Sequence, residues 1–378
     1  MEWIIDAVYY VVPFIILLGI LVFVHEFGHF IIARFCGVQV DAFSLGFGKT
    51  LWSRKDKYGT EWKLSAIPLG GYCQFLGDAD GASAGVDEKV KELNEEEKKR
   101  AFPFQNPFKK LAIVLAGPLS NYLFAILLFA SIFACFGKMV FPPIVGGVIE
   151  GGAAEKAGIQ PNDRILNING HDIASFDDMR KEIALVDDGN MVTIVIQRDD
   201  QTLTLTFPIT ELEYASEGGE AVKQRMLGVT SVHRVEIQPE EMGIITAFKE
   251  ACVETWDITT ATLRGVGQMI TGRRSSEELG GIIRIAEMSG DITKQYGWLD
   301  LISFMALLSI NLGLINLFPI PVLDGGHVVI FLLEIVTGKE INSRIKETLF
   351  KIGFSLLILL MVLATWNDIV RLFNRWFN

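Results

Sequence analysis

The stretch that decides the fold is VVPFIILLGILVFVHEFGHFIIAR, Val11 to Arg34, which carries His25, Glu26 and His29 near its end. Residues four apart lie on one face of a helix, so the two histidines can offer nitrogen ligands to one ion. With one further protein ligand, zinc keeps an open position for a water molecule, which the Glu26 carboxylate can deprotonate. The motif therefore predicts a zinc hydrolase whose third ligand lies elsewhere in the chain.

The surroundings of this motif are apolar. Every residue from Val11 to Val24 is apolar or glycine except Pro13, and the first cation after the motif is Arg34. A run of this length can cross the hydrocarbon core of a bilayer as a helix. HExxH patterns also occur by chance in soluble helices, but ionisable residues inside a membrane span are costly and indicate function. The sequence predicts a zinc site within the membrane.

Composition indicates a polytopic membrane protein, because 50% of the 378 residues are hydrophobic. The net charge of −11 gives no indication of nucleic-acid binding. An acidic start, with Glu2 and Asp6, argues against a cleaved signal peptide, so the first span is expected to be retained. The cysteines form no CxxC pair and predict neither a disulfide framework nor a thiolate metal site; they are Cys36, Cys73, Cys135 and Cys252.

Hydropathy predicts four spans, at about residues 8–33, 111–136, 299–336 and 348–367. The second contains Gly117 and Asn121, where small residues and one amide indicate close helix packing and a hydrogen bond to a neighbouring element. Packing and a direct role in the site are equally open for Gly117. The third is interrupted between Asn316 and His327, NLFPIPVLDGGH, where prolines and glycines break the helix and expose the Asp324 carboxylate. Helix is expected to resume at Val328.

A hairpin is expected between the first two spans, at about residues 60–76. This stretch has partial alternation, aromatic residues and a Pro-x-Gly-Gly bend, and it follows the glycine-broken residues 37–48. It could be a small surface hairpin. Its apolar character favours a re-entrant β element that dips toward the bilayer, where protein or a water-filled cavity must satisfy its main chain.

In residues 142–210 the sequence pattern becomes typical of a soluble domain, and this stretch resembles a PDZ domain. The resemblance rests on a small-residue helix at Ala153, the turn around Pro161 to Asp163 and the hairpin at Asn169-Gly170. PDZ domains bind peptides by strand addition and hold carboxylates in a backbone nest, which points to Gly146 and Gly147. A structural spacer is the alternative. Residues 211–297 are expected to form an amphipathic helical linker, of which 244–271 could lie along a membrane surface.

Taken together, HExxH and NxxPxPxLDGG on separate spans resemble the site-2 protease family of intramembrane zinc metalloproteases, in particular its bacterial regulator-of-sigma-E branch. The resemblance implies a polytopic α-helical membrane protein with a re-entrant β element and an inserted α+β PDZ domain. Its first and second membrane parts would be residues 1–136 and 298–378. Relatives in that branch often have two tandem PDZ domains, whereas this chain has room for one.

The same resemblance implies roles for individual residues. One zinc ion would be held by His25, His29 and Asp324, with Glu26 as general base and Asn316 contacting substrate or the developing oxyanion. The re-entrant element would hold an unwound substrate segment as an added strand, through Gly46, Gly48, Ile67, Gly70, Gly71 and Tyr72.

Cations indicate the orientation in the membrane. Arg34, Lys109 and Lys110 flank one face, and the loop before the last span adds further cations, whereas residues 137–299 contain 15 Lys and Arg against 25 Asp and Glu. The positive-inside rule places the metal site toward the cytoplasm and the PDZ domain outside. The resemblance implies that this membrane is a bacterial inner membrane.

The predicted function is hydrolysis of a peptide bond within a substrate's transmembrane helix. The expected substrate is a single-span anti-sigma factor that a site-1 type protease has already shortened, in an envelope stress response. Two alternatives stay open: a soluble HExxH peptidase with a membrane anchor, which needs its third ligand in a soluble region, and an inactive scaffold that recruits partners through the PDZ domain.

Overall fold

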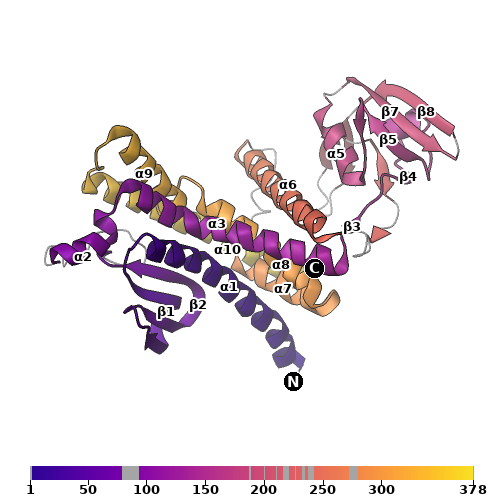
Figure 1. Ribbon diagram of the computed structural model, residues 1–378. Helices are drawn as coiled ribbons and strands as arrows, with labels where there is room; N and C mark the ends of the chain where they lie inside the picture. The colour runs from indigo at the N-terminus through magenta and orange to yellow at the C-terminus, as the bar shows by residue number, and fades with distance from the viewer. Residues whose placement is uncertain are drawn as a thin grey trace. The chain divides into compact units, whose positions relative to one another are not determined.

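The computed structural model describes residues 2–78, 93–186, 189–199, 201–209, 211–215, 221–225, 227–231, 235–236, 242–271 and 280–377 (Figure 1). Most of the polar tract after Asp78, residues 79–92, lies outside this set. The chain divides into two compact units. One comprises Met1–Ile132 with Ile244–Asn378, and the other comprises Phe133–Gly243.

Among the described residues, four helices are long and apolar enough to cross a membrane, as the hydropathy predicts. They are α1 (Glu2–Phe35), α3 (Pro107–Phe136), α8 (Trp298–Asn316) and α10 (Ser343–Phe377). Prolines inside α1 and α3, Pro13 and Pro118, interrupt the helical hydrogen-bond ladder without ending either helix. Such prolines are tolerated in membrane helices because neighbouring groups satisfy the freed carbonyls.

The other described helices of the membrane unit are α2 (Glu95–Arg100), the 3-10 helix η2 (Phe102–Phe104), α6 (Ile244–Ile270), α7 (Ile282–Gln295) and α9 (Asp324–Thr337). The break between α8 and α9 lies where Pro319 and Pro321 predict it. Helix resumes earlier than the predicted Val328, because α9 begins at Asp324 itself. An acidic residue is favourable in a first helical turn, where it faces the positive end of the helix dipole.

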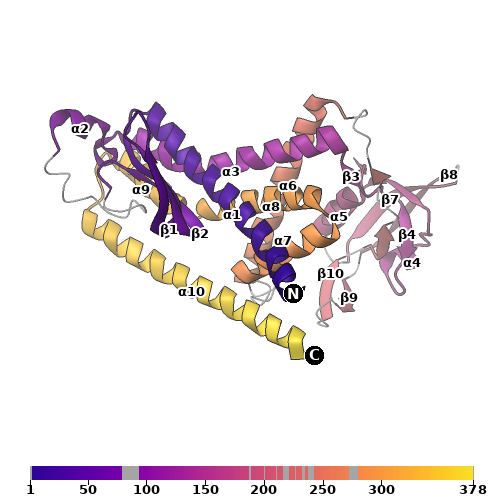
Figure 2. The same ribbon diagram turned by 90° about the horizontal axis from the view of Figure 1, so that it is seen from below.

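A bent antiparallel hairpin, β1 (Val40–Lys55) and β2 (Glu61–Phe75), packs against α1 (Figures 1 and 2). It starts some twenty residues before the predicted element, since residues 40–55 also form a strand. The first part of β1 lies between two parts of β2, pairing Ser44 with both Lys63 and Tyr72. The second part, 50–55, pairs only with 61–65. Residues 71–75 therefore form an edge of this small sheet.

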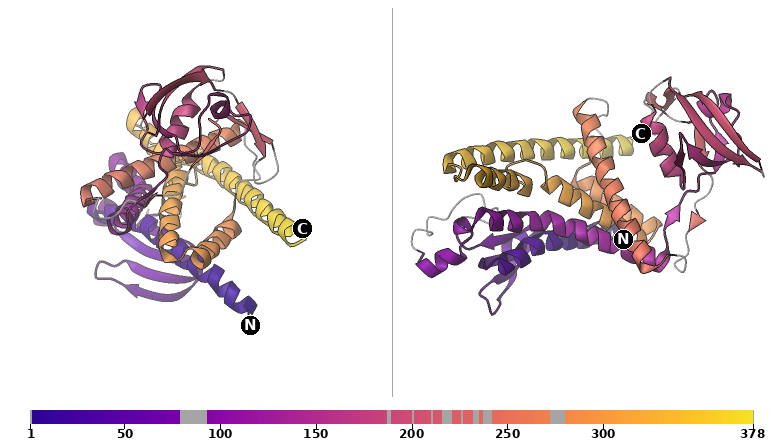
Figure 3. Two further views of the ribbon diagram at one scale, coloured as in Figure 1. Left: turned by 90° about the vertical axis from the view of Figure 1, so that its right-hand side faces the viewer. Right: turned by 45° about the horizontal axis from the view of Figure 1, so that its top comes forward.

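The core of the membrane unit lies where α1, the hairpin, α3 and α9 meet, around Phe30, Phe43 and Ile113. A second apolar cluster joins α1 to α8 through Leu17, Leu21, Leu301 and Phe304. Helix α10 is the outermost helix of this unit in two views (Figures 2 and 3). Most of its apolar side chains are exposed, as expected for a helix that faces lipid.

Two points of α10 are packed closely against the rest of the unit. Gly353 lies against Pro321 in the break between α8 and α9. Near the other end, the buried Asp368 carboxylate accepts hydrogen bonds from the N–H groups of Gly281 and Arg284, each at 3.1 Å. Because these groups belong to the first turn of α7 and have no helical partner, Asp368 caps that helix from another span.

The second unit contains a four-stranded antiparallel sheet of order β6-β5-β7-β8, with α5 (Phe176–Leu185) beside it (Figure 1). The short helix α4 (Ala153–Lys156) belongs to the same unit. Its strands are β5 (Arg164–Ile168), β6 (His171–Asp172), β7 (Met191–Arg198) and β8 (Gln201–Pro208). The core consists largely of β-branched residues such as Ile165, Ile194 and Ile196, none of them exposed. Asn169 and Gly170, both with positive φ, form the predicted turn between β5 and β6.

The prediction of a helical linker from residue 211 was wrong in its first part. Residues 211–236 contain β9 (Glu211–Ala215), β10 (Ala221–Arg225), β11 (Val229–Ser231) and β12 (Val235–Glu236). Strand β11 pairs with β4 (Val145–Val148), and β12 pairs with β3 (Met139–Val140). Polar residues on strands this short carry no clear helical or strand period, so only strand pairing fixes them as sheet. The unit therefore closes on itself well after residue 210.

Candidate metal centre

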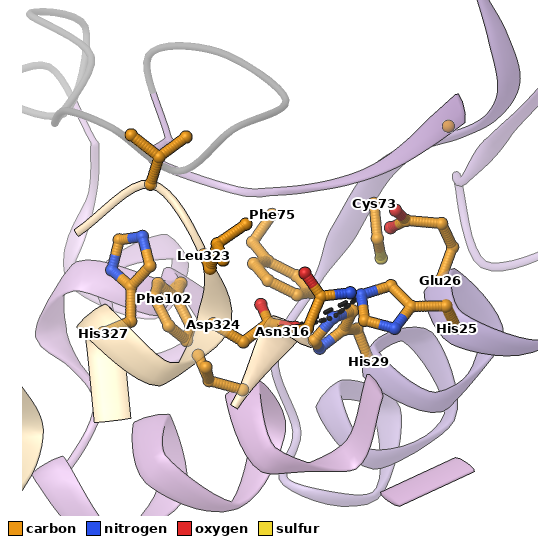
Figure 4. A pocket seen from close by; sticks show the side chains of 13 residues that line it. His25, Glu26, His29, Cys73, Phe75, Phe102, Asn316, Leu323, Asp324 and His327 are labelled. Atoms are coloured by element: carbon orange, nitrogen blue, oxygen red, sulfur yellow. Dashed lines mark hydrogen bonds and ion pairs between the residues drawn. The ribbon is translucent and has the colours of Figure 1, made fainter. Parts of the chain in front are cut away.

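Three potential metal ligands converge inside the membrane unit. Helix α1 places His25 and His29 one turn apart, with their Nε2 atoms 3.3 Å from each other. The carboxylate oxygen Oδ2 of Asp324 lies 3.2 Å from Nε2 of His25 and 3.5 Å from Nε2 of His29 (Figure 4). Among the described residues, this is the only group of three or more histidines, cysteines or carboxylates close enough to hold one ion.

The arrangement fits a tetrahedral zinc ion. Bonds of about 2.0–2.2 Å at tetrahedral angles separate neighbouring ligand atoms by about 3.3–3.5 Å, close to the three observed distances. Asp324 Oδ2 is also buried without a hydrogen-bond partner. Lone pairs that converge in this way repel one another unless a cation lies among them, so both geometry and donor chemistry suit zinc.

The helix break between α8 and α9 aims Asp324 at the histidines. The first turn of α9 packs so tightly against the break that a Cβ on Gly325 would lie 2.3 Å from the carbonyl oxygens of Leu317 and Phe318. At Gly326 a Cβ would lie 2.4 Å from Cα of Pro321. Larger residues would push α9 away, so the two glycines let the carboxylate reach its position.

Helix α3 supports His29 from the other side. The Nδ1 atom of His29 lies 2.9 Å from the carbonyl oxygen of Ile113, which accepts its proton and leaves Nε2 free to bind a metal. A Cβ on Gly117 would lie 2.2 Å from the same Nε2 atom. For Gly117 the structure shows close packing against a ligand: this position must lack a side chain for the His29 ring to fit.

Glu26 lies on the next face of α1, beside the hairpin. Its side chain lies near Gly71, where an added Cβ would come within 3.4 Å of its Cγ. Its carboxylate lies beside the main chain of Cys73 (Figure 4). With His25 and His29 it lines a cavity of about 200 Å³ that also reaches Asn316 and Asp324. A carboxylate in this cavity can exchange a proton with a water molecule held beside the three ligands.

The structure brings together only some of the residues predicted for the site. The cavity lining includes His25, Glu26, His29, Gly71, Asn316 and Asp324. Gly46, Gly48, Ile67, Gly70 and Tyr72 belong to the hairpin but are not in this lining. Phe47 pairs with Ile67, and its ring lies against Gly70, so these residues form the end of the sheet away from the turn at Asp56. Gly146 and Gly147 lie in β4 of the other unit.

Sequence reasoning missed several members of the cavity, namely Cys73, Phe75, Phe102, Val114, Val322, Leu323 and His327. Alternation along β2 could have found Cys73 and Phe75, because every second residue from Gly71 points to one side. The break motif itself contains Val322, Leu323 and His327. Phe102 and Val114 give no local signal, because only the packing of α3 and η2 against α1 brings them here.

The anchored soluble peptidase is disfavoured by this geometry. That alternative requires a third ligand from a soluble region, whereas Asp324 directly follows a membrane helix. The inactive scaffold is also disfavoured, since the ligand set and a carboxylate suited to act as base are all present.

Comparison with known proteins agrees with the geometry. The sequence profile of peptidase family M50 matches residues 13–360. The chain belongs to peptidase family M50. It is thus a zinc metalloendopeptidase of the site-2 protease type and a multi-pass membrane protein, as the motifs predict.

Bacterial relatives match along nearly their whole length. A protein of Agrobacterium fabrum, provisionally named a zinc metalloprotease, is 38% identical over 369 residues, covering 96% of each chain. One of Rickettsia conorii with the same provisional name is 39% identical, covering 96% of this chain and 99% of its own. Metalloprotease MmpA of Caulobacter vibrioides is 33% identical, covering 95% of each. A solved PDZ domain from Listeria monocytogenes is 18% identical and covers 25% of this chain and 93% of its own, with a TM-score of 0.19. That score does not establish a common fold.

Proposed function

We propose that this enzyme cleaves the transmembrane segment of a single-span membrane protein that has already been shortened outside the membrane. The observation that carries the proposal is the ligand cluster of His25, His29 and Asp324, built from helices that are long and apolar enough to cross a bilayer or directly follow one. A metal site formed by such helices suits the hydrolysis of peptide bonds inside the membrane. An anti-sigma factor of an envelope stress response is the substrate we consider first.

His25, His29 and Asp324 would hold one zinc ion, which when bound supplies a Lewis acid that polarises the scissile carbonyl. Glu26 takes a proton from the attacking water and returns it to the leaving amine. The Asn316 amide, at the end of α8 and inside the cavity, is placed to donate a hydrogen bond to the carbonyl oxygen as its negative charge develops.

A substrate helix must unwind before its buried peptide bond can be reached. The edge of β2 at residues 71–75 pairs with β1 on one side only, and Gly71, Cys73 and Phe75 face the cavity. An unwound segment added along this edge would exchange its helical hydrogen bonds for strand hydrogen bonds. Substrates with glycine or other helix-breaking residues near the cut should be favoured, because they unwind at a lower cost.

The hairpin has the polarity expected of a re-entrant element. Five of its exposed apolar side chains lie away from the turn, at Phe47, Leu51, Trp52, Leu64 and Ile67. Tyr58 is exposed in the turn itself, and Lys49 lies in the sequence between Phe47 and Leu51. The end at the turn carries charged groups, and it is tied to the end of α1 by the ion pair of Arg34 with Asp56. We place the charged end at the cytoplasmic interface and the apolar end in the bilayer.

Orientation can be tested with the native cysteines. We place Cys36 and Cys73 on the cytoplasmic side, Cys252 outside and Cys135 near the outer membrane edge, in a bacterial inner membrane. Cys73 is buried, so Cys36 and Cys252, both partly exposed, are the informative pair. A membrane-impermeant thiol reagent should label Cys252 but not Cys36 in intact spheroplasts, and both after lysis. Labelling of Cys36 in sealed cells would reverse the orientation.

For the unit formed by Phe133–Gly243 we propose a gating role as a PDZ domain. A folded substrate ectodomain would collide with it, whereas a stump left by a site-1 type protease could pass, or could place its new carboxylate at Gly146 and Gly147. Because β3 pairs with β12, the clean deletion removes residues 141–234 rather than ending at 210. Exclusion predicts that this deletion permits cleavage of the uncut substrate. Carboxylate capture predicts slower cleavage of the trimmed form.

The experiment that tests the main proposal is cleavage in reconstituted liposomes. Purified enzyme is mixed with a single-span substrate in trimmed and full-length forms, and product termini are mapped by mass spectrometry. We expect cuts inside the apolar segment of the trimmed form, and none with a chelator present. Cuts confined to soluble parts of the substrate would refute intramembrane proteolysis.

A further inference from the structure

Asn121 is an amide without any exposed surface in the middle of the apolar helix α3. The sequence predicts that its side chain bonds a neighbouring element, and the structure identifies that partner. Its amide lies 3.2 Å from Nδ1 of His25, which comes from α1. A buried amide that meets a proposed metal ligand calls for a more specific explanation than helix packing.

The direction of the His25 ring decides where its proton must be. Nε2 faces Asp324 and His29, at 3.2 and 3.3 Å, and Nδ1 faces Asn121. A neutral imidazole that binds a metal through Nε2 carries its single hydrogen on Nδ1. Nδ1 therefore needs an acceptor, and an amide NH2 group cannot accept.

The Asn121 side chain contains that acceptor. Its Oδ1 atom is buried and has no hydrogen-bond partner, while Nδ2 lies next to His25. The two ends of an amide have nearly the same size, so a half-turn about the Cβ–Cγ bond exchanges them within the same space. We infer that in the zinc-bound enzyme Asn121 turns Oδ1 toward His25 and accepts the Nδ1 proton, fixing the tautomer and orientation of this ligand.

The arrangement at the second histidine supports this assignment. Nδ1 of His29 already faces an oxygen acceptor, the carbonyl of Ile113, at 2.9 Å. Helix α3 thus supplies the outer partner of both histidines, once from its main chain and once from Asn121. Only the Asn121 acceptor can be removed by substitution.

Asn121 is also held in place. The main-chain carbonyl oxygen of Asn121 accepts a hydrogen bond of 2.9 Å from Oγ of Ser309 in α8, and Ser309 is fully buried. This contact ties α3 to the helix that ends at Asn316 and leads into the Asp324 turn. Asn121 is therefore a positioning residue, which acts on the metal through His25 without touching substrate.

Two variants separate this role from simple helix packing. Asn121→Leu keeps the volume but removes the acceptor, and Asn121→Asp keeps an acceptor but introduces a buried charge. If Asn121 orients His25, the aspartate variant binds zinc within a few-fold of the wild type, and the leucine variant binds about 10- to 100-fold more weakly. A packing role predicts the reverse order, because a buried charge disturbs an apolar interface more than leucine does.

Zinc affinity is measured by competition with a chelator on purified full-length protein, with no activity readout. Ser131→Ala is the matched control, because the Ser131 hydroxyl lies on the same helix and bonds only its own turn at Leu127; its affinity should not change. Wild-type zinc affinity in Asn121→Leu, or equal losses in both Asn121 variants, would overturn the inference.

The inference rests on the proposed ligand set, so His29→Ala is measured in parallel. Full zinc binding in His29→Ala refutes the ligand set rather than the role of Asn121. If Asn121→Leu does not fold, NMR of histidine-labelled, zinc-bound wild type and Asn121→Asp compares the resonance of the Nδ1 proton of His25. A carboxylate acceptor in place of an amide oxygen should move this resonance downfield and leave that of His29 unchanged, and an unchanged His25 resonance would overturn the inference.

Discussion

Two carboxylates, the partly buried Asp324 in the membrane unit and the buried Asp163 in the other unit, have opposite surroundings. Asp163 accepts hydrogen bonds from Nε and Nη2 of Arg198, at 2.8 and 2.7 Å, and from the N–H of Gln160 at 2.8 Å. Asp324 Oδ2 has no hydrogen-bond partner and faces two imidazole nitrogens. A carboxylate whose oxygens are bonded by protein donors stabilises a fold, whereas one left open among other ligand atoms is arranged for a cation.

Glu334, another buried carboxylate, has surroundings between these two extremes. Its Oε1 atom pairs with Nζ of Lys346 at 2.7 Å and accepts the N–H of Ile341, while Oε2 has no partner. The contacts join the end of α9 to the start of α10 and include no second ligand group. An orphaned oxygen therefore indicates a metal site only where other ligand atoms point at it.

The largest effect is expected at the metal centre of His25, His29 and Asp324, where catalysis can be lost without loss of the metal. Glu26→Gln removes the base and leaves all three ligands, so we expect zinc content to stay at the wild-type level. The cleavage rate should fall about 10²- to 10⁴-fold, the usual contribution of a general base. Zinc is measured by elemental analysis, with Asp324→Asn as the contrasting variant that should lose metal. Near-normal turnover by Glu26→Gln would remove Glu26 from the mechanism.

At Asp163, whose oxygens are both bonded by protein donors, we expect substitution to lower stability without lowering catalysis. Asp163→Asn weakens charge-assisted hydrogen bonds and should destabilise its unit by about 1.5–3 kcal/mol, as judged by limited proteolysis during heating. Exposed Glu347→Gln is the control, since its pair with Lys351 lies on the surface. Loss of zinc from Asp163→Asn would contradict the distinction between the two carboxylates.

Strong acid should remove the difference in stability between the wild type and Asp163→Asn. Burial alone would raise the pKa of Asp163, but hydrogen bonds from Arg198 and Gln160 hold that pKa below its ordinary value of 3.8. A carboxyl whose pKa is lowered by folding contributes stability above its unfolded pKa, and this contribution is lost as pH falls through the folded pKa. The stability gap between wild type and Asp163→Asn should therefore be full near neutral pH and shrink only in strong acid. A gap that disappears above about pH 5 would assign the acid sensitivity to another group.

Adding a methyl group at Gly117 tests whether the metal centre requires a residue without a side chain beside His29. Gly117→Ala places a methyl group against Nε2 of His29, and we expect zinc affinity to fall about 10- to 100-fold. Gly19→Ala in α1 is the matched control, because a Cβ there meets no atom within 4 Å. Chelator competition measures both. Equal affinities would show that His29 can move aside without losing the metal.

The smallest effect is expected at Asp368, a carboxylate satisfied by main-chain donors. Asp368→Ala removes the cap of α7 and should lower the stability of the membrane unit by about 0.5–2 kcal/mol, the usual worth of a helix cap. Thermal unfolding in detergent measures the change, and Asp368→Asn, which keeps one acceptor oxygen, should recover part of it. No shift in Asp368→Ala would mean that water replaces the carboxylate at this helix end.

The sequence by itself determined the local features. The length of the apolar runs predicted four spans, the four-residue spacing placed His25 and His29 on one face, and Pro319 with Pro321 marked the helix break. Each follows from properties of neighbouring residues: helical period, hydrocarbon thickness and the missing N–H of proline. The turn at Asn169-Gly170 belongs to the same class.

Only the tertiary structure decided which distant groups meet. It brought Asp324 to within 3.5 Å of both histidines. It placed the Asn121 amide beside His25 and packed Gly117 against the ring of His29. It also drew residues 229–231 into a sheet with 145–148, where polar sequence had suggested helix. These contacts depend on the rotation, depth and spacing of helices packed side by side and on strand pairing across long connections, none of which hydrophobic periodicity encodes.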